Sequence, residues 1–81
     1  MTIFPNPAKE SILVNYTINE TSNVEMLITD MTGKIVLQKD LGKVEGEQSN
    51  IIDISTMNIG YYILTIQSGE DRWVEKFVKV E

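Results

Sequence analysis

The sequence predicts an all-β domain, and three observations support this fold class. Apolar and polar residues alternate over most of the chain with the period of two that is typical of half-buried strands. No segment of helical length carries an apolar stripe at helical spacing. Polar clusters and glycine-containing turns separate the alternating segments, at the spacing of a sandwich of about seven strands. We therefore expect one antiparallel β-sandwich of two sheets.

The chain begins with a short apolar entry and a stiff corner. Ile3-Phe4 is expected to form a short strand, and Pro5-Asn6-Pro7 follows with both prolines of the chain. Each proline fixes φ, lacks an N–H and biases the preceding residue toward extended geometry, so the tripeptide is predicted to be a corner. Residues 11–18 then alternate, and the polar cluster 19–23 is expected to end that strand. The residues expected on its buried face are Ile12, Val14, Tyr16 and Ile18.

A hairpin is predicted in the middle of the chain. Val24, Met26 and Ile28 repeat the alternation, and the turn Asp30-Met31-Thr32-Gly33 follows with a glycine where positive φ is tolerated. Residues 34–41 form the returning strand. The remaining predicted elements are a polar, acidic connection at 42–49, a short strand at 50–54 and a compact crossing at 55–60.

Two further strands complete the domain. Residues 61–67 are rich in aromatic and branched side chains, which favour strands. The turn 68–71 leads to a closing strand at 72–80. Its alternation places Trp73 and Phe77 on one face and the valines on the other, which predicts burial on both faces over part of its length.

Composition limits the domain count and the possible partners. The chain has 81 residues, enough for one domain spanning 1–81, and a formal net charge of −5. That charge disfavours nucleic acid and anionic membrane surfaces as partners. No apolar run has the length of a membrane span and no signal peptide is recognisable, so an export signal would lie outside this sequence.

No catalytic, metal or cofactor site is expected. The chain has no histidine and no cysteine, which excludes a Ser-His-Asp triad, imidazole or thiolate metal ligands and a cysteine nucleophile. The carboxylate pairs Glu45/Glu47 and Glu70/Asp71 fall in predicted loops and are interpreted as solvated turn acids. Their spacing is not that of a calcium loop, and no glycine-rich phosphate loop is present. We therefore predict that the domain is not an enzyme.

Four segments of the chain, taken together, resemble the type A C-terminal sorting domain of the type IX (Por) secretion system. They are Ile3–Ala8 with Pro5, Asn6 and Pro7; the hairpin 24–36 with Asp30 and Gly33; 52–62 with Gly60 and Tyr62; and the closing Lys76, Phe77, Val78 and Lys79. The resemblance covers essentially the whole chain and implies an immunoglobulin-like β-sandwich. It also implies a role as a signal that directs an attached cargo protein across the outer membrane.

The resemblance assigns expected roles to particular residues. Pro5-Asn6-Pro7 would fix the exit angle from a cargo linker, and Gly60 and Tyr62 would form a strand entry and a corner tied by the tyrosine hydroxyl. The export machinery would read the last strand at Lys76–Lys79, with strand addition at a sheet edge as the proposed mode. One departure is that family members commonly end in lysine or arginine, whereas this chain ends Val80-Glu81.

The implied partners are an N-terminal cargo domain in the same polypeptide and outer-membrane secretion and sortase components. The implied location is the cell surface or the medium, reached through the periplasm, with the domain usually cleaved from its cargo and not itself inserted in the membrane. Two alternatives stay open: a passive immunoglobulin-like spacer beside an extracellular enzyme, and a carbohydrate-binding module that uses Trp73 and Tyr61 as an aromatic platform.

Overall fold

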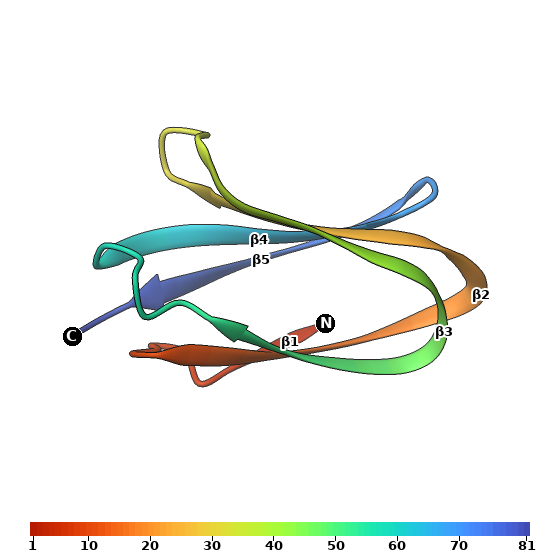
Figure 1. Cartoon of the computed structure of the whole chain (residues 1–81), viewed down its shortest axis with the longest axis horizontal. Helices are drawn as coiled ribbons and strands as arrows, with labels where there is room; N and C mark the ends of the chain where they lie inside the picture. The colour runs from red at the N-terminus through yellow and green to blue at the C-terminus, as the bar shows by residue number, and fades with distance from the viewer.

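A computed structural model describes all residues from Met1 to Glu81 and contains only antiparallel strand pairings between its named strands. The strands are β1 (Thr2–Phe4), β2 (Ser11–Asp30), β3 (Ile35–Asp53), β4 (Gly60–Ser68) and β5 (Asp71–Lys79). They follow the order β1-β2-β4-β5, and β3 pairs with the other edge of β2 (Figure 1). The chain forms no helix, and hence none that is long and apolar enough to span a membrane. The all-β prediction is confirmed.

The strand count predicted from the sequence is wrong, because there are five strands and not seven. The polar segments 19–23 and 42–49 do not end strands but lie inside β2 and β3. The β2–β3 pairing continues on both sides of the bend, with irregularities between Ile18 and Ser22 and between Val24 and Glu25, while Asn19–Thr21 within the bend have no paired residue on β3. Such irregularities let a paired strand bend. Gly46, opposite Ile18, has a φ of +84°, which glycine adopts without steric cost.

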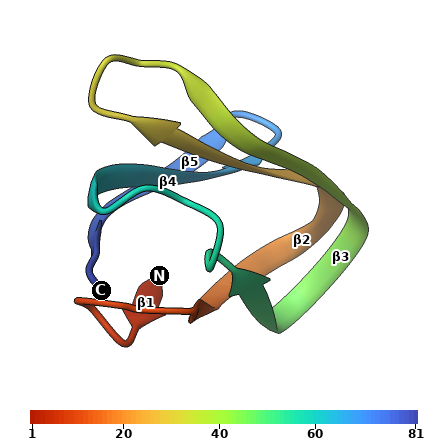
Figure 2. The same ribbon diagram turned by 60° about the vertical axis from the view of Figure 1, so that its left-hand side comes forward.

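The bent hairpin folds the sheet over on itself. β1 and the first half of β2 come to lie opposite β4 and β5, while β2 and β3 run continuously between the two levels (Figure 2). All five strands belong to one hydrogen-bonded sheet, so the predicted sandwich of two separate immunoglobulin-like sheets is not confirmed.

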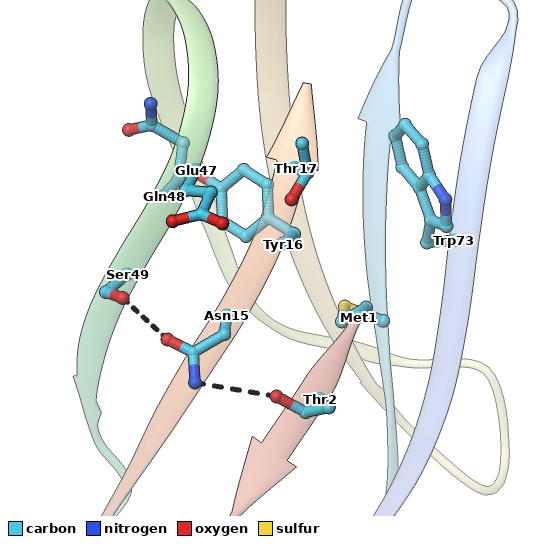
Figure 3. A pocket seen from close by; sticks show the side chains of 9 residues that line it. All are labelled: Met1, Thr2, Asn15, Tyr16, Thr17, Glu47, Gln48, Ser49 and Trp73. Atoms are coloured by element: carbon cyan, nitrogen blue, oxygen red, sulfur yellow. Dashed lines mark hydrogen bonds between the residues drawn. The ribbon is translucent and has the colours of Figure 1, made fainter. Parts of the chain in front are cut away.

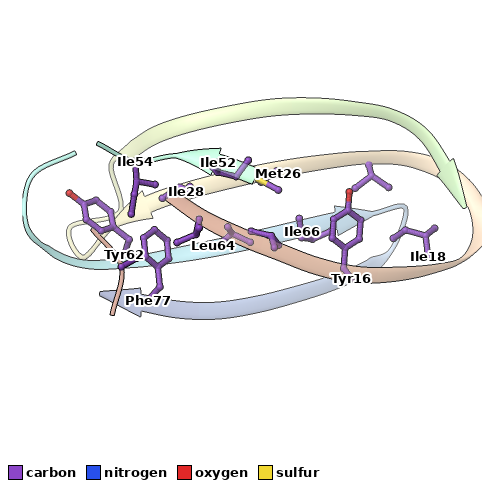
Figure 4. Packing of buried hydrophobic residues seen from close by; sticks show 14 residues of the cluster. Tyr16, Ile18, Met26, Ile28, Ile52, Ile54, Tyr62, Leu64, Ile66 and Phe77 are labelled. Carbon is purple, nitrogen blue, oxygen red and sulfur yellow. The ribbon is translucent and has the colours of Figure 1, made fainter. Parts of the chain in front are cut away.

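The core lies between the two levels of the folded sheet (Figure 4). The alternation predicted the inward faces of both halves of β2 correctly. The 14 buried apolar residues of the core are Ala8, Ile12, Val14, Tyr16, Ile18, Val24, Met26, Ile28, Ile52, Ile54, Tyr62, Leu64, Ile66 and Phe77. Burial of apolar side chains contributes about 25 cal/mol for each Å² removed from water, so this cluster supplies most of the driving force for folding.

Candidate recognition site on the last strand

β5 is an edge strand of the sheet. Its inner edge pairs with β4 in unbroken register, from Gly60 opposite Lys79 to Ser68 opposite Asp71. The other edge, called the outer edge below, has no partner strand along its first half. An edge strand exposes backbone donors and acceptors that another chain can use, so β5 is placed where a partner could reach it.

The four residues expected to carry recognition divide between the two faces of β5. The side chain of Phe77 is fully buried, and the whole of Lys79 is only 8% exposed. Lys76 is exposed and Val78 is half-buried on the opposite face. A partner that binds the folded domain can therefore contact Lys76 and Val78 directly, but not Phe77.

Phe77 is a core residue. Its ring stacks on the ring of Tyr62 with a centroid separation of 5.6 Å and an interplanar angle of 21°. Both rings lie at the end of the core where β4 begins and β5 ends (Figure 4). Aromatic pairs of this kind contribute about 0.5–1.5 kcal/mol beyond the burial of their area. Phe77 therefore holds the last strand in the sheet.

The face of β4 and β5 that points away from the core, called the outer face, carries a small exposed patch formed by Tyr61 of β4 with Lys76 and Val78 of β5. It is called the Tyr61 patch below. Tyr61 lies directly opposite Val78 across the β4–β5 ladder and is 55% exposed. The Lys76 Nζ sits 5.3 Å from the centroid of the Tyr61 ring, within the range of a cation–π interaction. The patch thus presents a positive charge held over an aromatic ring, beside an apolar side chain.

The Pro-Asn-Pro corner lies against the outer edge of β5, far from its place in the sequence. The Asn6 Nδ2 donates to the Lys76 carbonyl at 3.2 Å, and the Val78 N–H donates to the Asn6 Oδ1 at 3.0 Å. Ala8 continues the contact as an isolated parallel bridge to Lys79, donating from its N–H to the Val78 carbonyl at 2.9 Å. Both X–Pro peptide bonds of the corner are cis. The start of the chain therefore covers the second half of the outer edge (Figure 2).

Sequence reasoning missed this contact, because it placed the corner at the domain boundary and recognition at the opposite end of the chain. The sequence nevertheless contains an indication of this contact. The two prolines flanking Asn6 have no N–H. The side-chain amide of Asn6 is a donor and an acceptor together, the pair needed to cap a strand edge.

Asn6→Ala is expected to destabilise the domain by roughly 1–3 kcal/mol, because the substitution removes both side-chain hydrogen bonds to β5. It should also accelerate hydrogen exchange, measured by NMR, at the Val78 amide, which donates to Asn6, and at the Val80 amide, which donates to the Ala8 carbonyl at 2.8 Å. Asn19→Ala, at an exposed position in the bend of β2, is the matched control and should change neither quantity. Unchanged exchange at Val78 in Asn6→Ala would contradict the assigned contact.

The Gly60–Tyr62 segment forms the corner at the start of β4. Tyr62 is the buried tyrosine of the pair, 6% exposed, and its hydroxyl donates to the Asn58 carbonyl at 2.6 Å. That hydrogen bond ties the crossing at residues 55–59 to the strand. Tyr62 thus packs against β5 from the core side of the sheet, through the contact of its ring with Phe77.

The Asp30 turn closes the β2–β3 hairpin away from β5. The Asp30 Oδ1 accepts hydrogen bonds from the Thr32 N–H at 2.9 Å, the Thr32 hydroxyl at 2.6 Å and the Lys34 N–H at 3.1 Å. These bonds, led by the one from the Thr32 hydroxyl, lower the pKa of Asp30 below its ordinary value. Gly33 has a φ of +89°, which the turn requires and which other residues rarely adopt.

The aromatic platform considered for carbohydrate binding is contradicted. Trp73 pairs with the fully buried Ile66 and so points to the inner face of the sheet, where it packs against the core. Tyr61 lies on the outer face. The two rings cannot contact one sugar, because the sheet separates them.

Comparison with known proteins gives one match. The family model described as "Secretion system C-terminal sorting domain" matches residues 2–80, nearly the entire chain. No significant match to a curated protein or to a solved structure was found.

Proposed function

We infer that this chain, which belongs to the secretion system C-terminal sorting domain family, acts as a non-enzymatic signal that directs an attached cargo protein across the outer membrane. The proposal takes residues 1–81 as one sorting domain of a type IX system. Its cargo domain precedes it in the same polypeptide and is released or anchored at the cell surface, usually after cleavage of the sorting domain. The partners are outer-membrane secretion and sortase components.

The single observation that carries a role for the last strand is the exposed Tyr61 patch on its outer face. Lys76 and Val78 project from the outer face of β5, next to the exposed ring of Tyr61. We propose that the machinery reads the Tyr61 patch on the folded domain. Phe77 and Lys79 act indirectly in this proposal, because their burial keeps β5 in its register.

The corner supports this proposal by limiting where a partner strand could pair. Asn6 and Ala8 occupy the outer edge of β5 between Lys76 and Val80. Strand addition at that part of the edge would require the corner to move away. Recognition through side chains of the outer face requires no such movement, and we therefore propose side-chain recognition in place of strand addition.

The proposal is tested by fusing residues 1–81 to the C-terminus of a periplasmic reporter in a host with a type IX system. We expect the reporter to reach the cell surface or the medium, while the reporter alone stays in the periplasm. Retention of the fusion in the periplasm, with the domain folded, would contradict the proposal.

A further inference from the structure

One edge of β2 has no strand partner around its bend. β1 pairs with β2 only as far as Asn15, and β4 begins to pair with it at Val24. β3 occupies the opposite edge of β2, except at Asn19–Thr21 in the bend, so β1 and β4 share this one. The edge is therefore free from Tyr16 to Asn23, between two paired stretches. A free edge between paired stretches offers backbone donors and acceptors to an incoming extended chain.

A groove runs along this free edge, with Trp73 at its centre. Two depressions of ≈ 480 Å³ each adjoin at Trp73. The first extends past Thr17 to Met1 and the facing part of β3 (Figure 3), and the second extends along the bend of β2 to the β4–β5 turn at Ser68–Asp71. Together they are called the Trp73 groove below.

The Trp73 groove has a defined end and an aromatic wall. Ser22 and Ser68 are joined by a hydrogen bond between their hydroxyls, at the point where β2 and β4 begin to pair. Trp73 is half-buried, packs against the core and still lines both depressions. A half-exposed indole offers apolar area and a ring face that attracts cations.

Every charged side chain that lines the Trp73 groove is acidic. They are Glu20, Glu47, Glu70 and Asp71. No lysine or arginine lines either depression, although the chain has seven basic residues. This arrangement attracts basic segments and repels acidic ones, including a second copy of this chain with its net charge of −5.

We propose that the Trp73 groove binds an extended peptide segment of another protein that carries lysine or arginine at alternate positions. The peptide backbone pairs with β2 along Tyr16–Asn23. Its basic side chains face the four carboxylates, and one of them lies against the Trp73 ring. This site is separate from the Tyr61 patch, which lies on the other face of the sheet.

The test uses the 81-residue domain, labelled with ¹⁵N, and a capped peptide of about eight residues in which lysine alternates with valine and threonine, matching the free edge in length. NMR titration is expected to give saturable shifts at the amides of Tyr16–Asn23 and at the Trp73 indole N–H. Hydrogen exchange should slow at those of these amides whose N–H points to the free edge, since the donors of a strand alternate between its two edges. A peptide with every lysine replaced by glutamate should bind at least about tenfold more weakly.

Two double variants compare charge reversal inside the Trp73 groove with the same charge reversal outside it. Glu20→Lys with Glu70→Lys should weaken the lysine peptide at least about tenfold. Glu10→Lys with Glu81→Lys makes the same change in net charge away from the groove and should leave the affinity nearly unchanged. Equal losses in both double variants would overturn the proposal, because binding would then follow net charge alone.

Three other outcomes would also overturn it. The first is an absence of saturable shifts, and the second is a set of shifts confined to the outer edge of β5. The third is protection of the Tyr16–Asn23 amides that increases with domain concentration when no peptide is present, which would assign the free edge to a second copy. None of these results bears on reporter export through the Tyr61 patch, so the two proposals can fail separately.

Discussion

Tyr62→Ala is expected to destabilise the domain by about 3–5 kcal/mol, the usual cost of truncating a large buried side chain. The substitution removes a ring that stacks on Phe77 at 5.6 Å and a hydroxyl that holds the Asn58 carbonyl. A domain of 81 residues has a total stability of about 4–12 kcal/mol by the per-residue rule, so the variant should be largely unfolded or close to it. Urea denaturation followed by circular dichroism measures the change.

Two variants separate the contributions of Tyr62. Tyr62→Phe keeps the ring and removes only the hydrogen bond, so it should cost about 0.5–1.5 kcal/mol. Tyr61→Ala, one residue earlier and on the exposed face, should cost less than about 1 kcal/mol, most of it from the lost contact with Lys76. A larger loss from Tyr61→Ala than from Tyr62→Ala would show that the assignment of the faces of β4 is wrong.

The second large effect is expected on export. Lys76→Glu with Val78→Asp reverses the charge and removes the apolar side chain of the Tyr61 patch, so export of a fused reporter should fall at least about tenfold. Phe77 and Tyr62 stay in place, and the variant should remain folded. Reporter activity in the medium and on the cell surface, divided by total reporter, measures export.

The matched control lies on the same strand and the same face. Arg72→Glu with Val74→Asp makes the same chemical changes nearer the β4–β5 turn, outside the Tyr61 patch. We expect this variant to be exported almost normally. Equal export of both double variants would rule out recognition at Lys76 and Val78.

Deletion of the end of the last strand is a poor test of recognition. Deleting Phe77–Glu81 removes the ring that stacks on Tyr62 and the strand residues that pair with Tyr62 and its neighbours. Such a deletion is expected to unfold the domain, so loss of export after it does not report on recognition. Substitutions on the outer face avoid this ambiguity.

Alternation in the sequence predicted the local features well. It placed the inward residues of both halves of β2 correctly, and it predicted the Asp30 turn with its glycine at positive φ. These features depend on side-chain period and on turn chemistry, which neighbouring residues determine. The family resemblance implied a corner tied by the Tyr62 hydroxyl, and that hydroxyl donates to the Asn58 carbonyl from a buried ring, whereas Tyr61 is exposed.

The features that the sequence did not predict depend on distant pairings. The polar segment 19–23 resembles a loop, but β3 pairs with β2 on both sides of it and the strand continues through a bend. Asn6 resembles part of a linker corner, but its amide pairs with β5, 70 residues away at Lys76 and 72 at Val78. Local patterns carry no information about which remote backbone groups are left unpaired, so both features required the structure.

The most direct test of the sorting function compares positions of the intact domain within one reporter. Residues 1–81 are placed either at the C-terminus of the reporter or between two of its folded halves, in the same type IX host. A sorting signal predicts export in the first arrangement and retention in the periplasm in the second. Equal export from both positions would contradict the account and would identify the domain as a spacer.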